Sequence, residues 1–172
     1  MIHFKVKLEV CSFNKTHFFD YGRGRKMLNN IDARLTGDVL KILCDMGLKD
    51  ELVIADANFP AESIAKRLVR LPGIDANEFL SAILDIFPVD VEYSEQPAIV
   101  MDIFDSDKDA GMIIPSTWSD FERTLNQKYD DIYVSQMDYE DFMKRASNAY
   151  AIIQTGEERQ YGNLIISKGI VL

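Results

Sequence analysis

The chain has 172 residues, of which 47% are hydrophobic, and a formal net charge of −9. This length and composition predict one soluble domain and exclude disordered, collagen-like and disulfide-stapled proteins. No window offers about 18 uncharged apolar residues, so we expect no membrane-spanning helix. The two cysteines, Cys11 and Cys44, form no Cys-x-x-Cys motif. Because the N-terminus does not read as a secretory signal, we expect a cytoplasmic protein.

Charge is distributed unevenly along the chain. Residues 1–26 carry six basic and two acidic side chains, a net charge of +4, so residues 27–172 carry −13. A body this acidic repels phosphate backbones. We therefore expect no nucleic-acid partner.

The first 26 residues differ from the rest. Residues 2–10 alternate apolar and polar side chains, which predicts a half-buried strand, whereas residues 14–26 show no period. Two interpretations stay open: a genuine extra strand with its linker, or a segment upstream of a true start at Met27. The second is favoured because Gly-Arg-Gly-Arg can be encoded in purines alone, like a ribosome-binding site. We divide the chain into an N-terminal extension, 1–26, and a domain, 27–172, and assign neither histidine a catalytic role.

From Met27 onward, helical and strand patterns alternate. The expected helices are 37–46 with Thr36 as its cap, a short turn at 63–69, 77–87 capped by Asp75, 119–129 opened by a Ser119/Glu122 capping box, and 138 to 146 or 149. The expected strands are 52–55, 98–103, 132–135, 151–153 and 164–166, with a polar loop at 105–115. This alternation predicts an α/β layered fold with a largely parallel central sheet and helices on both faces.

Common motifs do not identify the chemistry. The chain lacks a Gly-x-Gly-x-x-Gly, a phosphate loop, a Gly-x-Ser-x-Gly and a zinc-type His/Cys cluster. Open α/β sheets bind ligands beyond the carboxyl ends of their strands, which selects residues 56–60, 155–157 and 161–163. Carboxylates and amides there can bind sugar hydroxyls while aromatic faces cover the C–H side. The alternative is that Asp56 only caps a helix or forms a turn, and that residues 162–163 are only a turn.

Two segments resemble the FucU/RbsD family, and within it the L-fucose mutarotase (FucU) branch. The first is 39–61, which contains Asp-Ala-Asn-Phe-Pro-Ala; the second combines 149–157 with the Tyr-Gly-Asn-Leu-Ile-Ile-Ser-Lys-Gly of 161–169. Residues 106–108, with Pro115 and Trp118, resemble the middle of the longer members. The resemblance runs from Met27 to the end of the chain.

The resemblance implies a layered RbsD-like fold and an isomerase that interconverts the α and β anomers of a free monosaccharide, with L-fucose expected. A non-catalytic sugar-binding homologue and a ribose pyranase-type activity are the alternatives. It also implies a ring-like homo-oligomer with sites at subunit contacts and neither a metal nor an organic cofactor. When the family's roles are carried over to the matching positions, the resemblance implies that Asp90 is a catalytic carboxylate. It also implies that Asp56, Tyr161 and Asn163 bind sugar hydroxyls.

Three positions depart from the family pattern. Leu48 stands where the resemblance implies a proton-donating His, and Met143 stands where it implies a catalytic Tyr. No Arg stands at 138–139, where a sugar-binding Arg is implied. Neither Leu48 nor Met143 can transfer a proton, which the reaction requires. The groups that remain for this task are Asp56, Asp90, Glu157 and Tyr161.

Two further expectations concern apolar side chains. The apolar C-terminus, 170–172, is expected to lie against a neighbouring subunit. Phe59 or Trp118 could cover the methyl group of a 6-deoxy sugar, or could belong to the core or a subunit contact.

Overall fold

A computed structural model describes residues 28–171. The helices are α1 (Gly37–Asp45), α2 (Ala61–Ile64), α3 (Ala76–Ile83), α4 (Asp105–Asp109), α5 (Ser116–Leu125) and α6 (Tyr139–Asn148). The strands are β1 (Glu51–Ala55), β2 (Leu68–Leu71), β3 (Ala98–Met101), β4 (Val134–Met137), β5 (Ala151–Thr155) and β6 (Leu164–Ser167). The predicted strand at 2–10 and the question of a start at Met27 lie outside the described residues.

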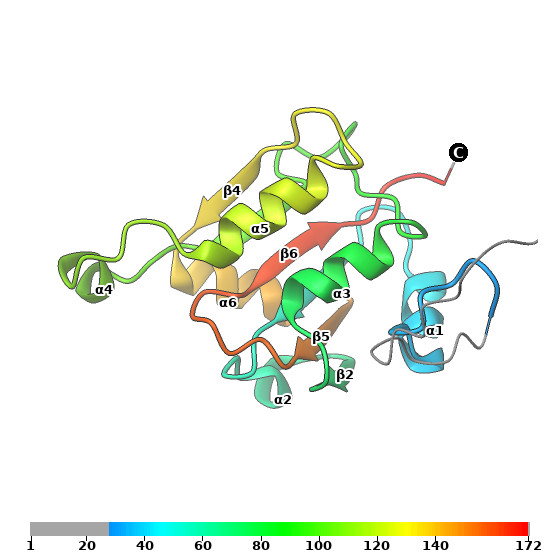
Figure 1. Ribbon diagram of the computed structural model, residues 1–172, viewed down its shortest axis with the longest axis horizontal. Helices are drawn as coiled ribbons and strands as arrows, with labels where there is room; N and C mark the ends of the chain where they lie inside the picture. The colour runs from blue at the N-terminus through cyan, green and yellow to red at the C-terminus, as the bar shows by residue number, and fades with distance from the viewer. Residues whose placement is uncertain (1–27, 172) are drawn as a thin grey trace, which may run out of the picture.

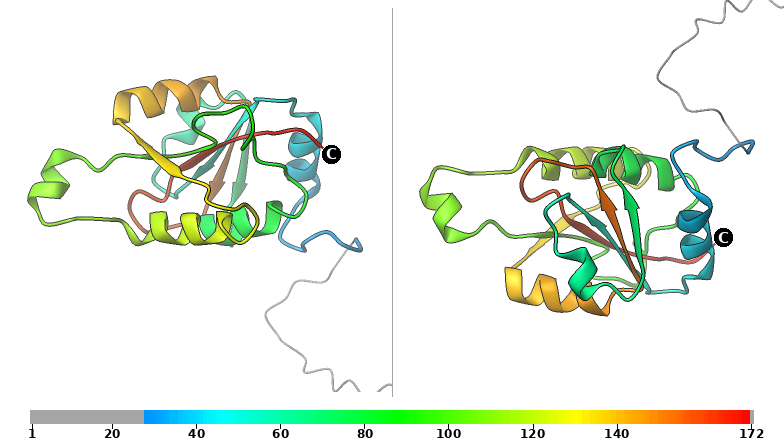
Figure 2. Two further views of the ribbon diagram at one scale, coloured as in Figure 1. Left: turned by 90° about the horizontal axis from the view of Figure 1, so that it is seen from above. Right: turned by 90° about the horizontal axis from the view of Figure 1, so that it is seen from below.

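The elements form three layers (Figures 1 and 2). The sheet lies between α3 and α5 on one face and α2 and α6 on the other, while α1 lies beyond one end. Its strand order is β2-β5-β1-β6-β3-β4, and every strand is parallel except β6, which runs antiparallel to both neighbours. The predicted α/β class, with a largely parallel sheet and helices on both faces, is confirmed.

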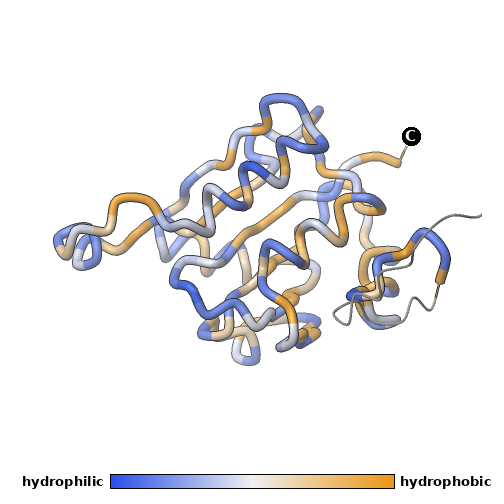
Figure 3. The backbone as a smooth tube through the Cα atoms, viewed as in Figure 1, coloured by the Kyte–Doolittle hydropathy of each residue, from blue (hydrophilic) through white to orange (hydrophobic). Residues whose placement is uncertain are grey.

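Burial explains why the central strands read as continuous apolar runs. Residues 52–55 of β1 and 164–166 of β6 are almost fully buried, because helices cover both faces of the sheet. Figure 3 shows hydrophobic residues along β6 at the centre of the molecule, whereas α3 alternates between hydrophobic and hydrophilic stretches. The sheet therefore provides a rigid frame on which loop residues at its two edges are fixed.

The two ends of the strands define two opposite sides of the sheet. The parallel strands all end at one edge, where the antiparallel β6 begins; we call this the carboxyl edge. At the opposite edge, the amino edge, the parallel strands begin and β6 ends. The α4 arm, residues 102–115, projects beyond the carboxyl edge, while α1 and the C-terminus lie beyond the amino edge (Figure 1).

Helix caps predicted from the sequence are largely present. Thr36 caps α1 by accepting from the Val39 N–H, and Asp75 forms a reciprocal capping box with Glu78 at α3. Asp138 caps α6 by accepting from the Asp141 N–H at 3.1 Å. These predictions are confirmed, although α3 ends at Ile83 rather than at 87.

Other boundaries were predicted wrongly. The Ser119/Glu122 capping box does not form, because α5 already begins at Ser116 after Pro115 and Ser119 lies inside the helix. The turn expected at 63–69 is instead α2 followed by the edge strand β2, whose side chains are partly exposed and so lack a clear apolar pattern. The 105–115 loop contains α4, and β4 is shifted two residues toward the C-terminus.

Candidate functional site

Asp56 and Asn163 form a side-chain pair at the carboxyl edge. Asp56 directly follows β1, Asn163 directly precedes β6, and these two strands are hydrogen-bonded neighbours. The Asn163 Nδ2 donates to Asp56 Oδ2 at 2.7 Å, and its Oδ1 accepts from the Asp56 backbone N–H at 2.9 Å. Asp56 Oδ1 also accepts from the Asn58 N–H at 3.0 Å, so Asp56 is a turn residue as well as a member of this pair.

Asp56 is only 5% exposed, rather than open in a cleft. Burial raises the pKa of its carboxyl group, and the hydrogen bond from Asn163 opposes this rise. A carboxyl group with a raised pKa holds its proton at a higher pH than an exposed one. It can therefore both donate and accept a proton closer to neutral pH.

Glu157 lies beside this pair but has a different electrostatic environment. Both of its carboxylate oxygens accept from the Arg159 guanidinium, at 2.9 and 2.8 Å, and Arg159 also reaches Asp120 at 2.8 Å. The Arg159 contact lowers the pKa of Glu157 despite its burial. Glu157 therefore stays ionised and is poorly suited to donate a proton.

Gly162 allows Asp56 and Glu157 to approach one another. A Cβ atom at this position would lie 2.6 Å from Glu157 Cγ and 3.4 Å from Asp56 Cβ. The Ala57 N–H donates to the Glu157 carbonyl at 2.9 Å, which joins the loops after β1 and β5. The absence of a side chain at Gly162 is thus part of the geometry of the site.

Tyr161 connects the carboxyl edge to the α4 arm. Its backbone φ is +60°, and its carbonyl accepts from the Trp118 Nε1 at 3.2 Å. Its hydroxyl donates to the Asp107 carboxylate and accepts from the Phe104 N–H at 3.1 Å. Burial, followed by the bond to Asp107, raises the pKa of Tyr161, so its hydroxyl keeps its proton and serves as a hydrogen-bonding group.

Asp90 lies at the amino edge, away from the three other predicted site residues. Its N–H donates to the Ser167 carbonyl at 2.9 Å, whereas Asn163 lies at the other end of β6, about 13 Å along the strand. Asp90 is 2% exposed, and its Oδ1 accepts from the Tyr93 N–H at 3.0 Å. Its Oδ2 is buried without a hydrogen-bond partner among the described residues.

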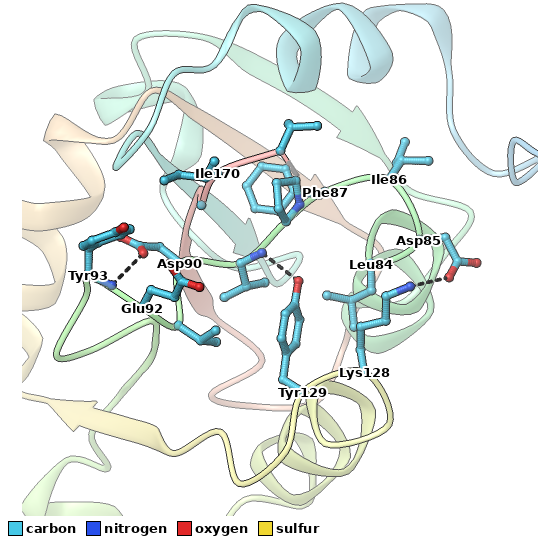
Figure 4. Close-up of a pocket in the computed structure, with 15 residues that line it drawn as sticks. Leu84, Asp85, Ile86, Phe87, Asp90, Glu92, Tyr93, Lys128, Tyr129 and Ile170 are labelled. Carbon is cyan, nitrogen blue, oxygen red and sulfur yellow. Dashed lines mark hydrogen bonds and ion pairs between the residues drawn. The ribbon is translucent and has the colours of Figure 1, made fainter.

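A mainly apolar cavity of about 370 Å³ adjoins Asp90 (Figure 4). Phe87, Tyr129 and Ile170 contribute to its wall, and the hydroxyl of Tyr129 accepts from the Val89 N–H at 2.8 Å. Ile170 and Val171 are exposed here, at the part of the C-terminus that was expected to lie against a neighbour. Within residues 28–171, the amino edge therefore combines a buried carboxyl oxygen that lacks a hydrogen-bond partner with an apolar surface.

Leu48, the first position that departs from the family pattern, lies toward the same amino edge, whereas residues 138–139 follow β4 at the carboxyl edge. Leu48 follows α1 and is 51% exposed, so it does not fill the core. Met143 is half-buried on α6, two residues before Arg145, which pairs with Glu51 at 2.6 Å. Arg145 and Glu51 line a polar pocket with Asp90. The sequence did not predict a role for Arg145 or Glu51, because these two paired residues are 94 positions apart in the chain.

For Phe59 and Trp118, the structure favours the core alternative over contact with a sugar methyl group. Phe59 and Trp118 are both buried, so they pack in the core rather than forming an exposed wall. Phe104, which carried no prediction, and Tyr139, within 138–139 where the resemblance implies an Arg, are half-exposed at the carboxyl edge. Among residues 28–171, no cluster of three or more His, Cys, Asp or Glu side chains could hold a metal ion. None of the helices in this part of the chain is long and apolar enough to cross a bilayer.

Known proteins are similar to this chain in both sequence and fold. A family model described as the RbsD / FucU transport protein family matches residues 29–171. A fucose mutarotase of Danio rerio is 40% identical over 148 residues, which cover 84% of this chain and 95% of that protein. An L-fucose mutarotase of Histophilus somni is 37% identical, covering 84% of this chain and 97% of its own length. The crystal structure of a Streptococcus pneumoniae fucose mutarotase in complex with L-fucose matches with a TM-score of 0.78 and 35% identity, over 84% of this chain and all of that one.

Proposed function

The chain belongs to the RbsD / FucU family, and from that premise we infer that it is a sugar mutarotase that interconverts the α and β anomers of L-fucose. The observation that carries this inference is the buried Asp56–Asn163 pair at the carboxyl edge. The similarity of the chain to mutarotases at 37–40% identity, and to a structure of a mutarotase in complex with L-fucose, supports the choice of reaction and sugar.

Anomer exchange requires the ring to open and close again. The anomeric hydroxyl loses its proton, the ring oxygen gains one, and the bond between C1 and the ring oxygen breaks to give the open-chain aldehyde. After rotation about the C1–C2 bond, the reverse transfers close the ring on the other face. A positioned acid and base typically accelerate such proton transfers by about 10²–10⁴-fold.

In this proposal, Asp56 both binds the sugar and exchanges a proton with it. The Asp56 carboxyl accepts hydrogen bonds from the Asn58 N–H and from Asn163 Nδ2, and the backbone N–H groups of Phe59 and Gly162 also act on it, so a sugar hydroxyl would share this donor-rich site or replace one of these contacts. The raised pKa of Asp56 suits it to deliver a proton to the ring oxygen, whereas the lowered pKa of Glu157 does not. Asn163 and Tyr161 supply further hydrogen bonds to sugar hydroxyls.

Asp90 is proposed as the second proton-transfer group, acting on a sugar held by another copy. Asp56 and Asp90 lie at opposite edges of one sheet, so one chain cannot apply both to the same sugar. A homo-oligomer in which the carboxyl edge of one copy meets the amino edge of the next would bring them together.

A cytoplasmic location, expected from the sequence, is part of the same proposal.

Saturation-transfer NMR of sugar anomers tests the proposed function. The protein is added to L-fucose at equilibrium, one anomeric proton is saturated, and the transfer to the other is compared with buffer alone. We expect clear acceleration with L-fucose and less with D-ribose. Binding detected by calorimetry without acceleration would instead identify a non-catalytic sugar-binding protein, and faster exchange of ribose would identify a pyranase-type activity.

A further inference from the structure

Two half-exposed aromatic side chains lie next to the proposed sugar site. Phe104 is 44% exposed and precedes α4, while Tyr139 is 42% exposed and begins α6 directly after β4. Their ring centroids are 5.1 Å apart, and the Phe104 ring lies 6.3 Å from that of Tyr161. Two large adjoining rings that stay exposed at the functional edge of a sheet are available to contact a ligand.

Strand order arranges these rings and the polar groups in one row. β1, β6, β3 and β4 are successive neighbours in the sheet. Along the carboxyl edge, the row therefore consists of Asp56 after β1, Asn163 and Tyr161 before β6, Phe104 after β3, and Tyr139 after β4. Hydrogen bonds or ring contacts join each position of the row to the next. The row thus has a polar half and an aromatic half, which meet at Tyr161.

Backbone contacts fix the aromatic half in place before any ligand arrives. The Phe104 N–H donates to the Tyr161 hydroxyl at 3.1 Å. The Asp102 N–H donates to the Met137 carbonyl at 2.7 Å, which holds the ends of β3 and β4 together. Because the rings are positioned by the fold, little conformational entropy would be lost when a ligand packs on them.

We propose that Phe104 and Tyr139 form the apolar wall of the sugar site and favour sugars whose C6 is a methyl group. This inference rests on the proposed function and specifies which sugars the proposed site prefers. Neighbouring strands are about 4.8 Å apart, so β1 and β3 are separated by about 10 Å, a gap that one monosaccharide can bridge. Its hydroxyls face Asp56 and Asn163, while its C–H side and methyl group pack on the rings. A C6 hydroxyl would lose its hydration against these rings without gaining a partner.

The test compares three sugars on the full-length protein. L-fucose has the C6 methyl group, L-galactose carries a hydroxyl on C6, and D-arabinose matches the ring configuration of L-fucose but lacks C6. Affinities are measured by calorimetry, and anomer exchange by saturation-transfer NMR, for the wild type, Phe104→Leu and Tyr139→Leu. Leucine keeps apolar volume but removes the flat ring face. Tyr133→Leu is the matched control, because Tyr133 is 69% exposed and lies just before β4 rather than after it.

We expect each leucine variant to lose about fivefold in affinity for L-fucose and much less for D-arabinose, so the preference for the methyl sugar shrinks. The control variant should match the wild type with all three sugars. Equal losses for all three sugars, or none, would overturn the assignment while leaving the mutarotase proposal intact. The assignment would also be overturned if light scattering showed that a leucine variant has a changed oligomer mass while its sugar preference is unchanged. That result would identify the two rings as a subunit contact. Failure of the wild type to bind or exchange any of these sugars would instead refute the proposed function itself.

Discussion

At the scale of single residues, the described part of the chain holds two buried aspartates in different environments. Asp56 is surrounded by donors, since Asn163 and the N–H of Asn58 both reach its carboxylate. Asp90 has a donor at one oxygen only, and the other is buried without a partner among the described residues. An unsatisfied buried carboxylate oxygen is destabilising, and such costs are typically retained where function requires them.

Asp90→Asn should separate function from stability. The amide oxygen can still accept from the Tyr93 N–H, while the carboxyl oxygen that lacks a partner among the described residues is replaced by an amide group. We expect calorimetry to give an unfolding temperature equal to or above that of the wild type, and anomer exchange to fall by about 10²-fold or more. Asp45→Asn, which changes an exposed carboxylate on α1, serves as the control for a lost charge. Undiminished exchange in Asp90→Asn would remove Asp90 from the mechanism.

Asp56 should give stability a pH dependence of definite sign. Burial raises the pKa of Asp56 above its ordinary value of 3.8. Between pH 3.8 and the raised value, the unfolded chain releases this proton while the folded chain keeps it. The stabilisation is therefore complete below pH 3.8 and is lost as pH rises through the folded-state pKa.

The measurement is urea unfolding of the wild type and of Asp56→Asn at several pH values. The free energy of unfolding of the wild type relative to the variant should fall as pH rises above 3.8 and then become level. Subtraction of the variant removes the contributions of the other carboxylates. A relative free energy that rises with pH over this window would contradict the assignment.

Leu48 offers a test of gained function. It is half-exposed in the polar turn after Gly47, so Leu48→His should be tolerated without loss of core packing. An imidazole there, with a pKa of about 6.5, should raise anomer exchange slightly and make it pH-dependent near that value. Combination with Met143→Tyr should increase the gain. Leu48→Asn is the polar control, and a folded double variant that binds L-fucose but exchanges it no faster would show that the family positions are misaligned here.

At the scale of elements, the antiparallel β6 builds the site. Because β6 begins where β1 ends, Asn163 meets Asp56 although the two residues are 107 positions apart. The rule that ligands bind beyond the carboxyl ends of parallel strands selected both segments from the sequence. It could not reveal their direct pairing, because no local pattern specifies which strands become neighbours.

Local signals determined how well the other elements could be predicted. Asp75, Asp138 and Thr36 are short-range caps, so the sequence located α3, α6 and α1 correctly. β2 was missed because an edge strand needs no continuous apolar run. The sequence also could not predict that Asp90 and Asp56 lie far apart, because their separation depends on the direction of β6 in the folded sheet.

Gly162→Ala tests the close packing of these loops. The added Cβ would lie 2.6 Å from Glu157 Cγ, so Glu157 must shift, and this disturbs the loop that packs against Asp56. We expect at least a tenfold loss of L-fucose affinity by calorimetry, since hydrogen bonds to charged groups contribute about 1.5–3 kcal/mol each. Gly73→Ala, whose Cβ meets nothing within 4 Å, should behave as the wild type. Unchanged affinity in Gly162→Ala would place the sugar elsewhere.

At the scale of the whole molecule, the proposed catalytic groups are divided between two edges of one sheet. The carboxyl edge has Asp56, Asn163 and Tyr161, and the amino edge has Asp90 beside an apolar cavity and the exposed Ile170. With a net charge of −13 on residues 27–172, copies of the chain repel one another at long range. Local apolar contacts must therefore hold an assembly together.

Mixing two inactive variants tests the central claim of a mutarotase site shared between copies. Asp56→Asn and Asp90→Asn each remove one half of every site, so each alone should show little anomer exchange by saturation-transfer NMR. After subunit exchange in an equal mixture, about a quarter of the interfaces should combine an intact Asp56 with an intact Asp90 from the neighbour, and exchange of L-fucose should recover to about that fraction. A mixture no more active than its components, or full activity in a wild-type protein that light scattering shows to be monomeric at micromolar concentration, would contradict the account.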